Sequence, residues 1–382
     1  MASIEFFKHN IGAREIKDVS RTLRQLFLTT GRNVDEFERA FAAYLGLPYA
    51  VGVTSCTAAL QLSLTALGVG PGDEVITTPM SFAATALAAI QASAVPVFVD
   101  VEPDTGNIDA SLVEKAITRR TKAILPVHLY GQMCDMRTLR AIADRHGLVI
   151  VEDAAHALEA RRDGVRVGEL GDAACFSFYP TKSITCGEGG AVAMKSGELA
   201  AKLCSMRHHG MNKSASDRYG RDDVTYEITM MGWKYNMDNI QAALLLGQLE
   251  RAEKFHSRRE RLARFYSRKL SGVPGIKFMR EFDNSRHARH LFTILVPPDK
   301  RAEFVQRMKE CGIGVSINYI PIHLQKFFRE TYGYKKGDFP AAEAIGESTV
   351  SLPLYPKLKQ KEAETVVETV KEIACELEFS DF

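Results

Sequence analysis

The sequence lacks both a cysteine framework and an excess of charge of either sign. Its seven cysteines are odd in number and widely spaced, and no two of them form a C-x-x-C pair. This pattern argues against a disulfide network and a zinc site, so we expect no bound metal and a reducing, cytoplasmic location. The 49 basic and 47 acidic residues give a formal net charge of +2 and are spread along the chain. Without a basic patch, nucleic acid is not an expected partner.

The sequence also has little that points to a membrane. Its N-terminal apolar stretch is interrupted by charges and is not followed by a small-residue cleavage site, so we expect no secretory signal. Residues 77–99 carry no charge and could span a bilayer by length alone. However, Pro79 and Pro96 interrupt them, which favours a turn, a helix over 82–91 and a buried strand over 95–99. We therefore expect no membrane association.

Two nucleotide-binding signatures, G-x-x-x-x-G-K-[ST] and G-x-G-x-x-G, are missing, and no internal repeat is visible. After a helical N-terminal region that breaks near residue 29, the chain instead alternates short β-rich runs with helical segments. This βαβ rhythm predicts an α/β fold with a mainly parallel seven-stranded sheet covered by helices. The expected strands are residues 49–53, 74–78, 95–99, 123–127, 148–151, 173–178 and 191–194.

A long, charged amphipathic helix is expected over residues 245–270. We place a domain boundary on it, with a large domain of residues 1–250 that includes the N-terminal arm and a small domain of residues 251–382. The small domain is expected to be α+β. Its elements are strands near 291–296 and 314–318 and helices over 302–311 and 362–377.

One lysine, Lys182, stands in a polar, Gly-rich turn directly after the apolar strand that ends near Phe178. A lysine so close to a buried strand lies near low-dielectric surroundings, where it is easily made a neutral nucleophile. Taken alone, the turn is better explained by a lysine that extends into water. The functional interpretation therefore depends on more distant residues.

Two further stretches suggest a ligand site at the strand ends. Residues 52–60 pass from a strand through small hydroxylated residues into a helix. The free N–H groups at the start of this helix could bind a phosphate, or they could simply be capped by a Ser or Thr side chain. Glu152 and Asp153 end a buried strand and point to opposite faces. An inward carboxylate needs a cationic partner, either a protonated ring nitrogen or an arginine. A phosphate cradle, this aspartate and Lys182 together match what pyridoxal 5'-phosphate requires.

Several motifs carry a family resemblance on top of this reasoning. From about Phe7 to Leu377 the chain resembles the DegT/DnrJ/StrS-type nucleotide-sugar aminotransferases, which are pyridoxal phosphate enzymes of the aspartate aminotransferase fold, fold type I. The matching motifs are TSCTAAL, ITTPMSFAAT, VDVEPDTGNID, PVHLYGQ, VEDAAHA, FSFYPTKSITCGEGG, KYNMDNIQAA and SLPLYP, in the family's order.

The resemblance implies a role for individual residues toward pyridoxal 5'-phosphate. Lys182 would bind the cofactor aldehyde covalently, Asp153 would pair with the pyridine nitrogen, and Phe82 would stack on the ring, although plain core packing is the alternative for Phe82. His156 would lie near the ring hydroxyl. The expected phosphate ligands are Thr57, Ala58, Ser177 and, contributed across a shared active site, the partner subunit's Asn236.

Two departures from the family pattern bear on the substrate. Many members have glutamine at the position of His156. Histidine occurs there in the branch that resembles the enzyme forming 4-amino-4-deoxy-L-arabinose on a uridine nucleotide. Asn318 stands where the family commonly has histidine. Tyr319 and His323 are the candidates for substrate contact, and a satisfied surface histidine is an equal alternative for His323.

We therefore expect a homodimeric, PLP-dependent aminotransferase that moves an amino group from L-glutamate, leaving 2-oxoglutarate, onto the 4-keto carbon of a nucleotide-linked sugar. The product would serve cell-surface glycan or lipid A biosynthesis. One alternative is a PLP-dependent sugar dehydratase, but the deoxygenating relatives replace the lysine with histidine and this chain keeps Lys182. Another is a non-catalytic regulatory or sugar-sensing protein on the same scaffold.

Overall fold

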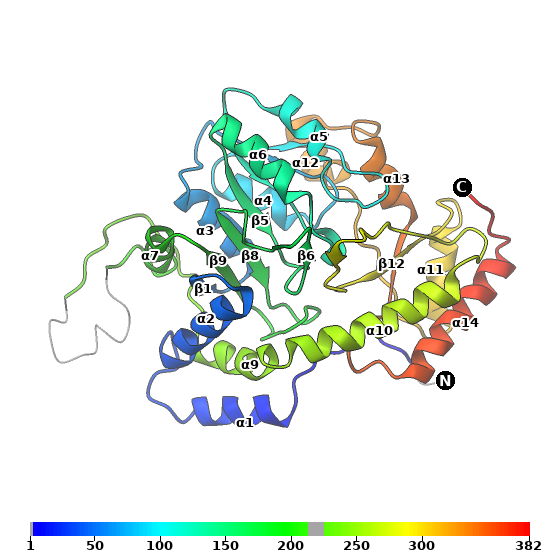
Figure 1. Cartoon of the computed structure of the whole chain (residues 1–382), viewed down its shortest axis with the longest axis horizontal. Coiled ribbons are helices and arrows are strands. Elements are labelled where there is room, and N and C mark those ends of the chain that lie inside the picture. Colours follow the sequence, from blue (N-terminus) through cyan, green and yellow to red (C-terminus); the bar gives the residue numbers. More distant parts are fainter. Residues whose placement is uncertain (1–2, 213–224) are drawn as a thin grey trace.

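The computed structural model describes residues 3–212 and 225–382 (Figure 1). The chain begins with an arm that contains α1 (Ala13–Thr22), and α2 (Arg32–Leu45) follows after the expected interruption around residue 29. One face of α2 is fully buried through Val34, Phe37 and Phe41, as its helical apolar spacing requires. Gly46 ends α2 in a left-handed conformation, with φ of 74°.

A seven-stranded sheet forms the centre of the molecule, in the order β1-β9-β8-β5-β4-β2-β3. Its strands pair in parallel except for β9, which is antiparallel to both β1 and β8. The expectation of a mainly parallel seven-stranded sheet is confirmed. The strands are β1 (Tyr49–Val53), β2 (Glu74–Thr77), β3 (Val95–Phe98), β4 (Thr121–Leu125), β5 (Val149–Asp153), β8 (Ala173–Ser177) and β9 (Gly190–Met194).

Helices cover both faces of this sheet because its strands are apolar on both sides. Ile150 of β5 packs into a cluster with α2, α6 and α9 (Asn239–Leu249), whereas its neighbour Val151 packs into a second cluster with α3, α4 and α7. The helices and short 3-10 turns of this region are α3 (Cys56–Ala66), α4 (Ala84–Gln91), α5 (Ala110–Val113), η1 (Glu114–Ala116), η2 (Leu129–Gly131), α6 (Met136–His146) and α7 (Gly197–Met206).

The uncharged stretch 77–99 is divided between β2, α4 and β3, as expected. Within residues 3–212 and 225–382, none of the helices has the length and apolar character needed to cross a membrane.

The single helix predicted over 245–270 is wrong, because the structure has two helices there, α9 (Asn239–Leu249) and α10 (Ala252–Leu270). Figure 1 shows α9 above α1, with α10 continuing toward the C-terminal part. The two residues at the break form ion pairs with α1. Glu250 pairs with Arg14 at 2.6 Å, and Arg251 pairs with Glu15. The interruption is therefore set by tertiary contacts with α1, whose close approach Gly247 permits, because a Cβ there would lie 2.7 Å from a Glu15 carboxylate oxygen.

The C-terminal part contains a small three-stranded sheet, in the order β10-β12-β13, with its own apolar cluster against α10, α11 and α14. The strand predicted over 314–318 is wrong: Ser316 forms only an isolated bridge with Ser351, on the edge of β13 that β12 leaves free. The elements are β10 (Lys277–Phe278), β12 (Phe292–Leu295), α11 (Arg301–Glu310), η3 (Ile322–Leu324), α12 (Lys326–Tyr332), α13 (Pro340–Ser348), β13 (Thr349–Leu352) and α14 (Gln360–Glu376).

A second small sheet joins the two parts of the chain. Its central strand β6 (Arg161–Arg162) pairs with β7 (Val165–Arg166) and with β11 (Ser285–Arg286) from the C-terminal part. The domain boundary at residues 250 and 251 stays a prediction.

Candidate active site

The carboxyl ends of β5 and β8 bring the two central candidates to the same edge of the sheet. Asp153 is the last residue of β5, and Ser177 is the last residue of β8, five positions before Lys182. The two strands are adjacent and parallel, with Asp153 paired to Cys175. A ligand that needs both a carboxylate and an amine can therefore be bound at this edge.

The Lys182 turn is ordered by its own hydrogen bonds. The Lys182 N–H donates to the Tyr179 carbonyl at 2.9 Å, and the Thr185 hydroxyl donates to the Phe178 carbonyl at 2.8 Å. The lysine side chain is partly exposed, and its Nζ lies 3.4 Å from Nε2 of His290. Burial lowers the pKa of Lys182 to about 8. The lysine therefore does not extend freely into water, and a large fraction of its amine is neutral near pH 8.

The Asp153 carboxylate is almost completely buried, with 6% of its surface exposed. It accepts a hydrogen bond from the Thr85 hydroxyl at 2.7 Å and one from the Ala155 N–H at 3.2 Å. Burial raises the pKa of Asp153. Its hydrogen-bond donors are a hydroxyl and a backbone amide rather than the arginine considered from the sequence, so a bound cationic ring nitrogen would supply a charge partner.

Thr85, which the sequence reasoning missed, orients this carboxylate from the first turn of α4. We expect Thr85→Val to lower kcat/KM about tenfold, because one hydrogen bond to a charged group is lost while the side-chain shape is kept. Steady-state kinetics of the aminotransfer reaction would measure this. Thr65→Val is the matched control, because the Thr65 hydroxyl only donates back to the Gln61 carbonyl of its own helix. A Thr85→Val enzyme as active as the control would contradict the positioning role.

His156 and Tyr319 form one wall of the site. The Tyr130 N–H donates to Nδ1 of His156 at 3.2 Å, which leaves the proton of the neutral ring on Nε2, 3.1 Å from the Tyr319 hydroxyl oxygen. Burial lowers the pKa of His156 well below its usual value, so the ring is neutral. Phe82 is 63% exposed, and its ring centre lies 6.1 Å from that of Tyr319. Core packing is therefore wrong for Phe82, whose face is open to a ligand.

The N-terminus of α3, where Cys56 is near Asp153 and Lys182, is already capped. The Ser55 hydroxyl accepts a hydrogen bond from the Ala58 N–H at 3.1 Å, so the capping alternative is present in the structure. Gly190 at the start of β9 allows the close approach of this turn, because a Cβ there would lie 2.4 Å from a Ser55 backbone atom. Thr57 is half-buried in the first turn. Phosphate binding by Thr57 and Ala58 stays a prediction.

Two other expected phosphate ligands have protein partners in this chain. The Ser177 hydroxyl accepts a hydrogen bond from the Tyr179 N–H at 3.3 Å. Asn236 forms a bridge with Val53 at the end of β1 and donates through Nδ2 to the Thr30 hydroxyl at 2.8 Å. Their contacts with a cofactor phosphate stay predictions.

His323 is not on the surface, and its expected place at the substrate is not supported. Its side chain is fully buried and lies 2.9 Å from the Glu343 carboxylate. Glu343 also accepts the Gly337 N–H at 2.8 Å. The pair holds a C-terminal loop, a role that the sequence does not reveal because histidine and glutamate are 20 residues apart.

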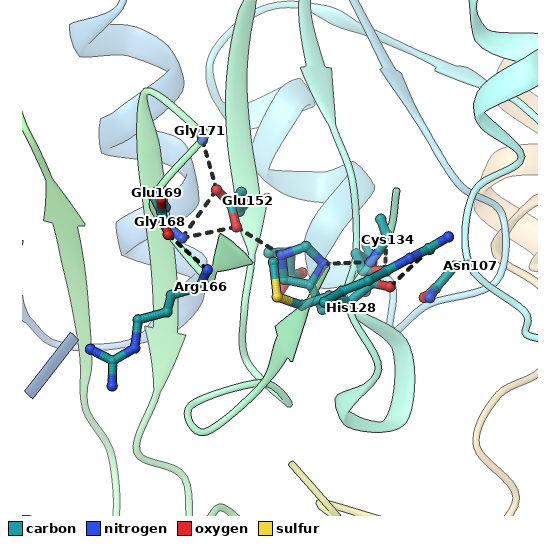
Figure 2. Close-up of polar contacts among 12 residues, drawn as sticks. Asn107, His128, Cys134, Glu152, Arg166, Gly168, Glu169 and Gly171 are labelled. Carbon is teal, nitrogen blue, oxygen red and sulfur yellow. Dashed lines mark hydrogen bonds and ion pairs between the residues drawn. The ribbon is translucent and has the colours of Figure 1, made fainter. Parts of the chain in front are cut away.

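Glu152 and Asp153 point to opposite faces of the sheet, as the strand pattern predicts. The Glu152 carboxylate lies 2.8 Å from Nε2 of His128 and accepts the Gly171 N–H at 2.8 Å; Figure 2 shows both contacts. The Cys134 N–H donates to the other ring nitrogen of His128 at 3.2 Å. His128 therefore has a hydrogen-bonded structural role, and Glu152 fixes the loop around Gly168 and Gly171 on the face of the sheet opposite to Asp153.

Comparison with known proteins decides the family. A model described as the DegT/DnrJ/EryC1/StrS aminotransferase family matches residues 9–371. The chain belongs to this family. It is 43% identical over 369 residues to the spore coat polysaccharide biosynthesis protein SpsC of Bacillus subtilis, with 95% of each chain covered. It is also 40% identical over 363 residues to a pleiotropic regulatory protein of Geobacillus stearothermophilus, covering 94% of this chain and 93% of the relative.

Solved structures of aminotransferases have the same fold. DesV from S. venezuelae superposes with a TM-score of 0.87 at 39% identity, covering 95% of this chain and 94% of that one. The PLP form of the putative sugar aminotransferase Spr1654 from Streptococcus pneumoniae superposes with a TM-score of 0.92 at 31% identity, covering 98% and 99%. The protein is therefore a fold type I, PLP-dependent enzyme of the sugar aminotransferase family.

The side chains of this aminotransferase fit pyridoxal 5'-phosphate on physical grounds. Lys182 provides an amine with a lowered pKa, and the buried Asp153 carboxylate has neutral hydrogen-bond donors. Phe82 presents an exposed aromatic ring. A small cavity beside Lys182 is lined by His156 and Ser177, which are both expected cofactor neighbours. These features together suit an aldehyde, a protonated ring nitrogen and a flat aromatic ring.

Proposed function

We propose that this aminotransferase transfers the amino group of L-glutamate to the 4-keto carbon of a nucleotide-linked sugar, for the biosynthesis of a cell-surface glycan or of lipid A. The observation that carries the proposal is Lys182, whose pKa is lowered and which lies in the turn after β8, the strand that pairs with the Asp153 strand, in a chain of the sugar aminotransferase family. The relation to a spore coat polysaccharide biosynthesis protein supports the glycan pathway.

In this proposal, pyridoxal phosphate supplies an electron sink for negative charge at the α-carbon of the bound amino acid. Asp153 holds the proton on the pyridine nitrogen, since its buried carboxylate gains a cationic partner there. Lys182 would hold the cofactor through Nζ, and its amine, once free, would move the proton at the α-carbon as a base. Its pKa of about 8 leaves the amine in both protonation states near neutral pH, as such a proton carrier requires.

Tyr319 is the proposed substrate-side residue. Its hydroxyl is hydrogen-bonded to His156, and its ring is tilted at 49° to that of the exposed Phe82. Both rings are therefore at the open side of the site, where a sugar can approach. Asn318, whose Oδ1 is buried without a hydrogen-bond partner, precedes Tyr319 and departs from the family's histidine. The 4-amino-4-deoxy-L-arabinose branch stays a prediction.

We further propose a homodimer with a shared active site, in which the partner subunit's Asn236 reaches the cofactor phosphate. Apolar side chains on the N-terminal arm and in the region after residue 225 are exposed to water in a single chain. A second copy of the chain that covered them would remove this exposure, which supports a dimer. The exposed residues are Ile16, Leu23, Leu26, Leu28, Ile228 and Met231. The seven free cysteines support a reducing cytoplasm as its location.

The test has two stages. Purified, cofactor-loaded protein is first mixed with L-glutamate, and we expect the visible absorption band of the bound cofactor to be lost while 2-oxoglutarate appears. The aminated enzyme is then incubated with a panel of keto-sugar nucleotides, and mass spectrometry identifies the aminated product. Conversion of a 4-keto sugar is the expected result, and failure with every 4-keto sugar would overturn the substrate class.

A regulatory or sugar-sensing protein is the second candidate, favoured by the similarity to a pleiotropic regulatory protein. The first stage separates the two, because a sensor that binds the cofactor without turnover would leave the absorption band unchanged on adding glutamate. Loss of a sugar hydroxyl without transfer of nitrogen would indicate the dehydratase alternative.

A further inference from the structure

A histidine outside the family motifs quoted above lies against the Lys182 amine. His290 lies just before β12, which begins at Phe292, and is 7% exposed. Its Nε2 lies 3.4 Å from Nζ of Lys182. It is 108 residues away in sequence, so no spacing in the chain indicates the contact.

The His290 ring is held by packing. Its ring centre lies 4.3 Å from that of His156, with 30° between the ring planes. The backbone on both sides is attached to the η2 turn, since the Ala288 N–H donates to Gly131 at 2.8 Å and the Leu291 N–H donates to Tyr130 at 3.3 Å. Because the same turn also donates to His156, the two imidazoles are fixed to one piece of backbone.

A buried guanidinium joins this segment to the lysine turn. Arg259 of α10 pairs with Glu159 at 2.8 Å and donates to the Ala288 carbonyl at 3.2 Å. It also donates to the hydroxyl of Ser183 at 3.1 Å, the residue directly after Lys182. Arg259 therefore sets the distance between the two chain segments that carry the lysine amine and the imidazole.

The charges around His290 favour its neutral form. After burial, the largest electrostatic influences on His290 come from the basic side chains of Lys182, His156, Arg259 and His287. The acid of this network, Glu159, pairs with Arg259 and accepts the Ser183 hydroxyl. Burial, followed by the charge of Lys182, lowers the pKa of His290 well below its usual value. A neutral imidazole has one nitrogen with a free lone pair, which can accept a hydrogen from the lysine ammonium or amine.

We propose that His290 is the positioning residue of Lys182, and that its Nε2 accepts a hydrogen from Nζ and so fixes the direction in which the amine presents its lone pair. The proposal rests on the cofactor-binding role of Lys182 but is independent of which sugar is aminated. His290 acts through Lys182 and supplies no proton to the substrate.

The test uses the protein freed of cofactor, to which pyridoxal 5'-phosphate is added at pH values from about 5.5 to 10. The initial rate at which the visible absorption band of the bound cofactor appears is measured at each pH, and its midpoint reports the ionisation of the lysine amine. The wild-type midpoint is expected near pH 8, the pKa of Lys182. In His290→Leu the ammonium loses an acceptor within the same apolar volume, so the midpoint should fall by about one pH unit.

His290→Gln keeps an acceptor oxygen and should retain the wild-type midpoint. His287→Gln is the matched control, because His287 is in the same segment and its Nδ1 accepts the Arg289 N–H at 2.9 Å. It should change the melting temperature at most. If His290→Leu fails to fold, His290→Asn takes its place, since its shorter amide cannot span the same distance. A wild-type midpoint in the folded Leu or Asn variant would overturn the proposal.

The outcome is separable from that of the proposed function. A wild-type protein that binds the cofactor with the expected midpoint, yet aminates no keto sugar, would overturn the substrate assignment alone.

Discussion

Replacing Lys182 with alanine is expected to lower kcat/KM by about 10⁴-fold or more, the largest effect of any single substitution in this chain. The variant loses both the amine that binds the cofactor covalently and the base that moves the α-proton. Lys182 is also the amine whose pKa is brought to about 8 by burial. The measurement is single-turnover formation of 2-oxoglutarate from L-glutamate.

Lys195→Ala is the control for this experiment. Lys195 follows β9 on the surface, and its Nζ donates to the Glu169 carbonyl. Its removal is expected to leave turnover unchanged. A Lys182→Ala enzyme that still turned over at a rate comparable to the control would contradict the assignment of Lys182.

Asp153→Asn is expected to lower kcat/KM by roughly 10²- to 10³-fold, the size of effect typical for removal of a preorganised electrostatic partner. The amide keeps the shape of the carboxylate and can still accept the Thr85 hydroxyl, whose hydrogen bond is 2.7 Å long. It cannot hold the pyridine nitrogen in its protonated form, so the electron sink is weakened. Steady-state kinetics at a fixed, saturating cofactor concentration would separate this effect from weaker cofactor binding.

Asp172→Asn provides the matched control. Asp172 directly precedes β8, and its carboxylate accepts the Ile150 N–H of β5 at 2.7 Å. Asp172→Asn is therefore the same chemical change at a carboxylate that supports the same strand. We expect it to affect the melting temperature rather than kcat. Equal loss of kcat in the two variants would show that Asp153 acts through the fold alone.

The sequence predicts the central sheet well because its signals are local. Apolar runs such as the one ending at Asp153 read as buried strands, and the order of strands and helices requires the carboxyl ends of the parallel strands to share one edge. The meeting of Asp153 and Lys182 at that edge follows from these rules. The opposite orientation of Glu152 follows from the two-residue period of a strand.

The features that the sequence does not predict depend on contacts between distant segments. The break between α9 and α10 is fixed by Arg14 and its neighbour on α1. Thr85 ends the motif ITTPMSFAAT and His290 lies outside the quoted motifs, but for neither residue does the sequence show the contact with Asp153 or Lys182. His323 was misplaced because a sequence does not reveal that Glu343 provides it with a buried partner.

The most direct test of the account locates the cofactor on the chain. Purified protein loaded with pyridoxal 5'-phosphate is treated with borohydride, which reduces the bond between the cofactor and a lysine to a stable link, and the digested protein is sequenced by mass spectrometry. The account predicts that the added mass is on Lys182 and that the label is absent from the Lys182→Ala variant. A label on another lysine, or no covalent label on the loaded wild-type protein, would contradict it.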